Sequence, residues 1–315
     1  MTEGWEVTWV PPPASNQLSG GRNVLTMWNN FKTTILLAAM TGLVLAVGDL
    51  WGGRNGLVIA LVLAAVMNLG SYFFSDKIAL ASSGAQPISR EDGPRIYQIV
   101  ERLAAKANIP PPKIYFIPTD SPNAFATGRN PNHASVAVTR GILDICDDEE
   151  IEGVLAHELG HVKNRDILTS AVVATLAGAI TVIADMVMWG EMLGGFGGGG
   201  FGGGSDNRRG GVFSALAMMI VAPLAATLIQ LAISRSREYE ADHTGAEITG
   251  NPQGLARALD KIDKWAKRIP MQVSPSMAHL YLYQPRTKGE FFAGLFSTHP
   301  PIRKRIERLI GRDEI

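Results

Sequence analysis

The sequence lacks the features of a disulfide-rich or nucleic-acid-binding protein. It has one cysteine, Cys146, and a single cysteine can form neither an internal disulfide nor a thiolate metal cluster. Lys and Arg total 29, and so do Asp and Glu, so the net charge is zero. Binding to phosphate needs a basic excess. We therefore expect Cys146 to be a packing residue, and we expect no nucleic acid among the partners.

Charged residues of either sign are also scarce, which indicates a membrane protein. They make up 18% of the chain, below the ~25% usual for soluble domains, whereas apolar residues make up 46%. Four apolar stretches approach the length that a helix needs to cross about 30 Å of hydrocarbon. These four candidate spans run over about 31–50, 56–74, 167–189 and 212–233.

The candidate spans divide the chain into five parts. In order, these are a disordered extension (1–26), a transmembrane hairpin (27–75), the first part of a cytoplasmic domain (76–166), a second hairpin with a Gly-rich outer loop (167–233) and the second part of that domain (234–315). Basic residues gather beside the inner span ends, which predicts that the domain and both termini are cytoplasmic. Met27 opens a stretch typical of a natural start, so both Met1 and Met27 stand as candidate starts.

In the cytoplasmic parts, apolar residues follow a helical spacing in some segments and a strand-like spacing in others. Three short strand-like segments, at 113–117, 123–127 and 135–139, lie between helical patterns. The predicted fold class is therefore α+β, mainly α, with a small antiparallel or mixed sheet beside four transmembrane helices.

One predicted helix carries a metal-binding pattern. His157, Glu158 and His161 form an HExxH pentad after an acidic helix start at 147–150. Residues four apart share a helix face, so both imidazoles can reach one zinc ion. Glu158 lies about 100° around the axis, where it can reach a water on the metal. A chance match is the alternative, but six histidines in the whole chain make one rare.

A third ligand is needed, and the segment 234–242 offers the best candidate. Glu238 precedes Asp242 by one helical turn, so the two share a face. Asp242 can accept the N–H of a ligand histidine and fix its tautomer. Glu240 points elsewhere, and we expect it to be solvated.

These motifs resemble those of the HtpX family of bacterial membrane heat-shock proteases and of the related CAAX prenyl proteases, over about residues 27–311. The resemblance rests on the pentad at 157–161, Ser-Arg-x-x-Glu-x-x-Ala-Asp at 234–242, Asn-Ala-Phe-Ala-Thr-Gly at 123–128, Ala-His-Leu at 278–280 and Thr-His-Pro-Pro at 298–301.

The resemblance implies a gluzincin in the bacterial inner membrane, with one zinc ion per chain. Its ligands would be His157, His161 and Glu238, and Glu158 would be the base. The resemblance also implies an edge strand at 123–128, where an extended peptide substrate would pair with the residues Asn123, Ala124 and Phe125.

The remaining histidines are weaker candidates. An oxyanion stabiliser is needed, and His299 and then His279 could supply it, although a structural role for either stays open. We expect His133 and His243 to be surface or packing residues.

The ligands lie close to the candidate spans along the chain. His161 precedes the third span and Glu238 follows the fourth, so at 1.5 Å per residue both lie within about 10 Å of the span ends. This predicts membrane proteins as substrates. The loose selectivity of an edge strand suits misfolded or damaged ones, and the resemblance implies a role in quality control and stress response. A processing peptidase for lipid-modified tails, a non-catalytic membrane chaperone and a channel stay open as alternatives.

Overall fold

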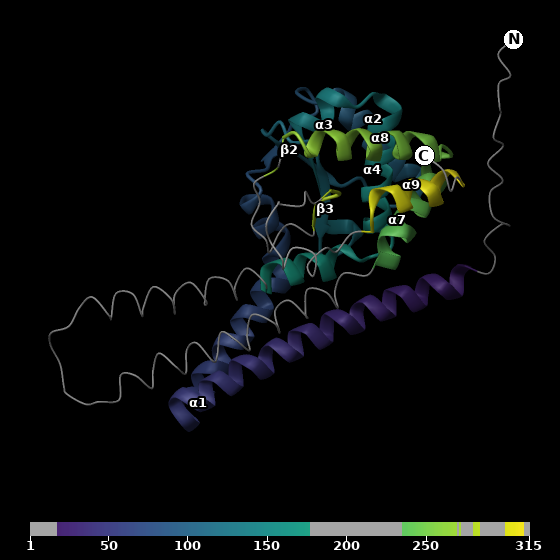
Figure 1. Cartoon of the computed structure of the whole chain (residues 1–315). Helices are drawn as coiled ribbons and strands as arrows, with labels where there is room; N and C mark the ends of the chain where they lie inside the picture. The colour runs from purple at the N-terminus through teal and green to yellow at the C-terminus, as the bar shows by residue number, and fades with distance from the viewer. Residues whose placement is uncertain (1–17, 177–234, 270, 272–279, 284–299, 312–315) are drawn as a thin grey trace, which may run out of the picture.

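The computed structural model of the chain describes residues 18–176, 235–269, 271, 280–283 and 300–311. Figure 1 shows a long helical hairpin that projects from an α+β body. The hairpin is α1 (Leu18–Ser82), in which two helices meet at Gly53, with φ of +52°. Glycine adopts this left-handed conformation without the steric cost of a Cβ. Asn68 Nδ2 donates to Thr41 Oγ1 across the two arms at 2.8 Å.

The second arm of α1 differs from an ordinary surface helix. Within the described part of the chain, Gly53–Ser82 is the one helix long and apolar enough to cross a membrane. Many of its large apolar side chains are exposed, among them Val58, Ile59 and Val62. Two shorter apolar helices, Thr33–Ala46 and Ile167–Leu176, accompany it.

The predicted spans meet the structure to different degrees. The spans 31–50 and 56–74 lie in the two arms of α1, and 167–189 is described only as far as residue 176. The span 212–233 and the Gly-rich loop lie outside the described residues. Residues 18–26 of the extension predicted to be disordered lie in α1 and are helical. Once a helix exists, each added residue gains a hydrogen bond at little further cost.

The sheet is small and mixed. Its strands are β1 (Gln86–Pro87), β2 (Lys113–Ile117), β3 (Ala124–Gly128) and β4 (Ala134–Thr139). Their order is β1-β2-β4-β3, with β2 and β4 parallel and the other two pairs antiparallel. Each of the three predicted strands appears within one residue of its predicted bounds, and β3 lies at one end of the sheet.

Helices build the rest of the body. They are α2 (Pro94–Ala107), the short 3₁₀ turn η1 (Pro131–His133), α3 (Arg140–Ile145), α4 (Asp148–Lys163), α7 (Arg235–Thr249), α8 (Pro252–Ala266) and α9 (Ile302–Ile310). The expectation of a mainly helical chain with a small mixed sheet is confirmed. A Cβ on Gly245 of α7 would lie 2.9 Å from the backbone nitrogen of His157, so this glycine lets α7 approach α4 closely.

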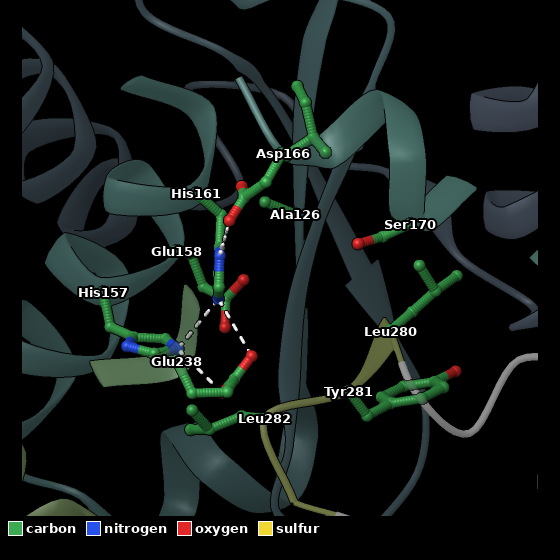
Figure 2. A pocket seen from close by; sticks show the side chains of 11 residues that line it. Ala126, His157, Glu158, His161, Asp166, Ser170, Glu238, Leu280, Tyr281 and Leu282 are labelled. Carbon is green, nitrogen blue, oxygen red and sulfur yellow. Dashed lines mark hydrogen bonds and ion pairs between the residues drawn. The ribbon is translucent and has the colours of Figure 1, made fainter. Parts of the chain in front are cut away.

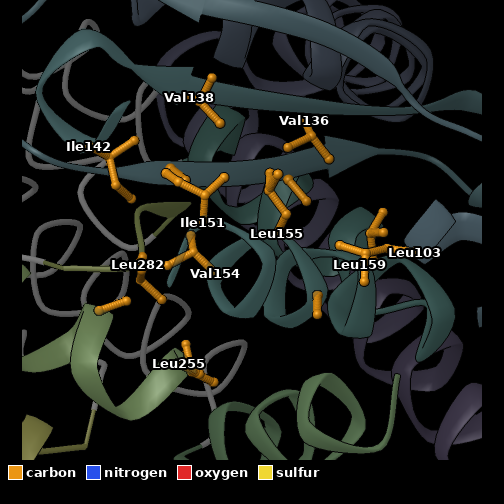
Figure 3. Close-up of a cluster of buried hydrophobic side chains, with 14 of the residues drawn as sticks. Leu103, Val136, Val138, Ile142, Ile151, Val154, Leu155, Leu159, Leu255 and Leu282 are labelled. Atoms are coloured by element: carbon orange, nitrogen blue, oxygen red, sulfur yellow. The ribbon is translucent and has the colours of Figure 1, made fainter. Parts of the chain in front are cut away.

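The sheet has two covered faces. On one face, Val136 and Val138 pack against α4 residues such as Ile151 and Leu155, as Figure 3 shows. On the other face, Phe125 belongs to a cluster with residues from the end of α1 and from the helix Ile167–Leu176. The end of α1 and the helix Ile167–Leu176 thus pack directly on the sheet.

Candidate metal centre

The helix α4 begins at a capping box and carries the pentad into the core. Asp147 Oδ1 accepts the backbone N–H of Glu150 at 2.9 Å, and Glu150 Oε2 accepts that of Asp147 at 2.9 Å. His157 and Glu158 are 1% and 2% exposed. Burying such polar groups is costly unless they are paired, so each needs a partner.

Side chains of α4 and α7 converge on one point, as Figure 2 shows. The Nε2 atoms of His157 and His161 are 3.1 Å apart. Glu238 places Oε1 3.6 Å from His161 Nε2 and Oε2 3.8 Å from His157 Nε2. One ligand atom from each of the three residues lies within 4.8 Å of the other two, so the group is positioned to hold a metal ion.

Each imidazole is held from behind by a carboxylate. His157 Nδ1 lies 2.9 Å from Asp242 Oδ1, and His161 Nδ1 lies 2.9 Å from Asp166 Oδ2. A carboxylate at Nδ1 keeps the proton there and leaves Nε2 as a lone pair. Two lone pairs that face each other at 3.1 Å repel unless a cation lies between them. The donor set therefore fits a divalent metal ion.

Charges around the pocket favour a cation at this place. Burial lowers the pKa of His161, but the carboxylate of Asp166 and then that of Glu238 outweigh it and raise the pKa to about 10. For His157, burial and the Arg305 guanidinium lower the pKa to about 4. The acids thus attract positive charge to the His161 side of the pocket, and a metal ion would supply it in place of a proton.

Glu158 has the environment of a general base. Burial raises its pKa to about 7, against the opposing charge of His161 and a hydrogen bond from the backbone N–H of Ala126. A base whose pKa is near the working pH is the most effective in proton transfer. Glu158 also lines the same cavity, of about 30 Å³, as the three candidate ligands.

Two residues of the site were missed by the sequence reasoning. The sequence offered one local indication of Asp166, since this carboxylate stands five residues after His161 and just past the end of α4. Arg305 of α9 is fully buried and binds Asp242 through two bonds, of 2.9 Å from Nε and 2.7 Å from Nη2. Its signal is its place in an apolar stripe of i, i+3, i+4 and i+7 spacing with Ile302, Ile306 and Leu309, where a charged residue is unusual.

The other predicted residues lie in different places. Asn123 directly precedes β3, and Ala124 and Phe125 begin it, all three of them buried. His279 and His299 lie outside the described residues. Three residues expected to be peripheral, His133, Glu240 and His243, are exposed. The predicted packing residue, Cys146, is buried.

Comparison with known proteins identifies the family. A sequence model of Peptidase family M48 matches residues 90–313. The chain belongs to peptidase family M48. Family membership and the buried His/His/Glu group together make it a metalloprotease.

Several M48 relatives carry the name "Protease HtpX homolog". The relative from Desulforapulum autotrophicum is 53% identical over 284 residues, which cover 90% of each chain. That from Syntrophobacter fumaroxidans is 54% identical over 90% of this chain and 99% of its own. That from Aquifex aeolicus is 51% identical over 86% and 89%. These likenesses and the apolar helix Gly53–Ser82 make the chain a membrane-bound M48 peptidase.

One solved structure, the "Crystal Structure of S. mikatae Ste24p", is also similar. It matches 90% of this chain and 66% of its own, with a TM-score of 0.47 and 20% identity.

Proposed function

We propose that the chain is a zinc endopeptidase that hydrolyses misfolded or damaged membrane proteins in the bacterial inner membrane. Its ligands are His157, His161 and Glu238, and its base is Glu158. The observation that carries the proposal is the convergence of two imidazole Nε2 atoms and one carboxylate beside a buried glutamate.

The donor set favours zinc. Two histidines and one glutamate leave a fourth position open, as catalytic zinc sites do. Asp242 and Asp166 orient the two imidazoles, and Arg305 neutralises Asp242 from behind. When bound, zinc lowers the pKa of a water and polarises a peptide carbonyl.

Glu158 then moves the proton. Its carboxylate, in the lining of the pocket, takes a proton from the attacking water and passes it to the leaving amine. His299 and His279 are our candidates for stabilising the oxyanion.

The substrate binds as an added strand. Asn123, Ala124 and Phe125 lie in or beside β3, at the end of the sheet order. A peptide that pairs with such an edge gains main-chain hydrogen bonds whatever its sequence. Selection by side chains is then loose, which suits the clearance of damaged proteins.

The site lies next to the membrane. The helix Ile167–Leu176 begins directly after Asp166, a partner of His161. The end of α1 packs on the face of the sheet that carries Phe125. With four spans and a cytoplasmic domain in two parts, 76–166 and 234–315, the enzyme would receive chains that emerge from the bilayer.

The first test is purification in detergent with a chelator, followed by zinc analysis and casein cleavage before and after the metal is restored. We expect one zinc ion per chain and activity only with the metal. Cleavage by the fully metal-free protein would contradict the proposal.

A second test concerns the substrate class. In membranes, we expect an unfolded substrate tethered to the bilayer to be cleaved faster than the same substrate free in solution. Equal rates would contradict the membrane-protein assignment. A prenylated peptide cleaved in preference to a misfolded membrane protein would favour the processing peptidase.

A further inference from the structure

The backbone of β3 has a row of N–H and C=O groups that face away from β4, and this row leads toward Glu158, the proposed base. Asn123 C=O accepts the N–H of Thr139 at 3.0 Å, so Asn123 faces β4. Along a strand in an antiparallel pair, successive residues face alternately toward the partner and away from it. Ala124 and Ala126 therefore face away from β4, about 7 Å apart at the usual strand rise. Ala126 lines the same pocket as Glu158.

The segment Leu280–Tyr283 already occupies the start of this row. Leu282 donates its N–H to the C=O of Ala124 at 3.0 Å. Tyr283 donates its N–H to Asn123 Oδ1 at 3.2 Å, and Asn123 Nδ2 donates to the C=O of Tyr283 at 2.8 Å. These contacts bind the main chain of the segment, and a peptide of any sequence could make them.

The segment also crosses the edge of the sheet. Leu280 and Tyr281 pack on the face of the sheet that carries Phe125, and the rings of Tyr281 and Phe125 lie edge to face with centroids 5.0 Å apart. Leu282 and Tyr283 join the core on the opposite face. All four residues are buried, with at most 9% exposed.

With the segment in place, the metal pocket is too small to hold a peptide. Leu280, Tyr281 and Leu282 line the pocket beside the candidate ligands, as Figure 2 shows. The cavity of about 30 Å³ is roughly a tenth of the ~300 Å³ at the lower end of ligand sites. A substrate peptide that lies along β3 with its scissile bond beside Glu158 would also run past the carbonyl of Ala124. Leu282 already occupies that carbonyl.

We propose that Leu280–Tyr283 is an internal occupant of the peptide groove, and that it inhibits the enzyme until a substrate displaces it from β3. The proposal rests on the proposed function, in which the substrate pairs with β3. It differs from a purely structural role in one respect, because displacement of the segment must accompany peptide binding.

The first experiment removes the hydrogen bond from the segment and leaves the groove intact. Leu282→Pro lacks the N–H that binds Ala124. Leu282→Met keeps the N–H and a side chain of similar volume. On a quenched peptide, we expect Leu282→Pro in the full chain to raise kcat/KM about threefold to tenfold, mainly through KM, which matches the value of one hydrogen bond. We expect the rise for Leu282→Pro to exceed any change for Leu282→Met, which separates the loss of the N–H from the change of side chain.

The second experiment uses the wild-type chain and does not depend on a variant that folds. Amide hydrogen exchange at Leu282 is measured with and without a saturating peptide hydroxamate. We expect the protection of the Leu282 amide to fall by at least tenfold when the hydroxamate binds. Unchanged or increased protection would overturn the proposal, as would a folded Leu282→Pro chain with lower kcat/KM than wild type.

The two proposals fail in different ways. A wild-type chain that neither binds zinc nor cleaves casein contradicts the proposed function. A wild-type chain that does both while Leu282 stays protected contradicts the internal occupant alone.

Discussion

The helix α4 and the second arm of α1 differ in the kind of side chain that they bury. The first buries polar groups, and the second exposes apolar ones. On α4, His157 and Glu158 are nearly fully buried. On α1, Val58 and Ile59 are 61% and 69% exposed. In a soluble protein each pattern would be unfavourable, because charged residues belong at the surface and clusters of large apolar ones inside. We propose a separate cause for each pattern, namely a metal site in α4 and a lipid environment around α1.

The energetic support for the two helices differs accordingly. The buried groups of α4 are stable because carboxylates and a guanidinium surround them, from Asp166, Asp242 and Arg305. For the exposed side chains of α1, we propose that the hydrocarbon of a membrane is the solvent. Substitutions on α4 and its partners test the first kind of support, and substitutions on α1 test the second.

The largest effect is expected at Glu158. Glu158→Gln removes the proton acceptor and should lower kcat about 10³-fold to 10⁴-fold while zinc content stays at one per chain. The measurement is turnover of a quenched peptide beside elemental analysis. The matched control is Glu240→Gln, since Glu240 is exposed on α7. If Glu158→Gln turned over the peptide within tenfold of wild type, Glu158 would not be the base. Such turnover would also count against a binding-only chaperone, because the chain would still be an enzyme.

The next largest effect is expected at Arg305. Arg305→Met leaves Asp242 as a buried charge without its guanidinium, and breaking such a pair costs about 3–5 kcal/mol. Denaturant unfolding in detergent measures the loss. Lys304→Met, at an exposed position on the same helix, serves as control. Equal stability of the two variants would show that the buried pair contributes nothing.

On the apolar side of the comparison, Val66→Lys places a charge where we expect lipid, at an exposed position near the centre of the span 56–74. The substitution should cost about 3 kcal/mol of insertion free energy. Alkaline extraction of membranes measures the fraction of chain retained, with Val66→Leu as control. If Val66→Lys were retained as firmly as the control, the second arm would not lie in hydrocarbon.

A smaller effect is expected at Asp166. Asp166→Asn weakens the hold on the proton of His161 Nδ1 and should reduce zinc affinity about 10-fold to 100-fold. Competition with a chromophoric chelator measures the affinity, and exposed Asp144→Asn is the control. An unchanged affinity would remove Asp166 from the support of the metal site.

The sequence predicted the parts of the site that depend on local spacing. The pentad in α4 and the three longer strands follow from helical and strand periodicity within one segment. The two-residue strand β1 has too few residues to show a period.

Contacts between distant segments left no such signal. Arg305 meets Asp242 across 63 residues of chain, and Tyr283 meets Asn123 across 160. Periodicity describes which face of an element is apolar, but it does not say which other segment will cover that face. The closure of the groove by Leu280–Tyr283 therefore became visible only in three dimensions.

X-ray absorption at the zinc edge of the purified full chain tests the metal assignment most directly. We expect one zinc ion with two imidazole nitrogens at about 2.0–2.1 Å and carboxylate oxygen at about 2.0–2.2 Å, and we expect Glu238→Gln to alter the oxygen shell while the imidazole shell stays. A chain without zinc, or a spectrum with a single imidazole, would contradict the account.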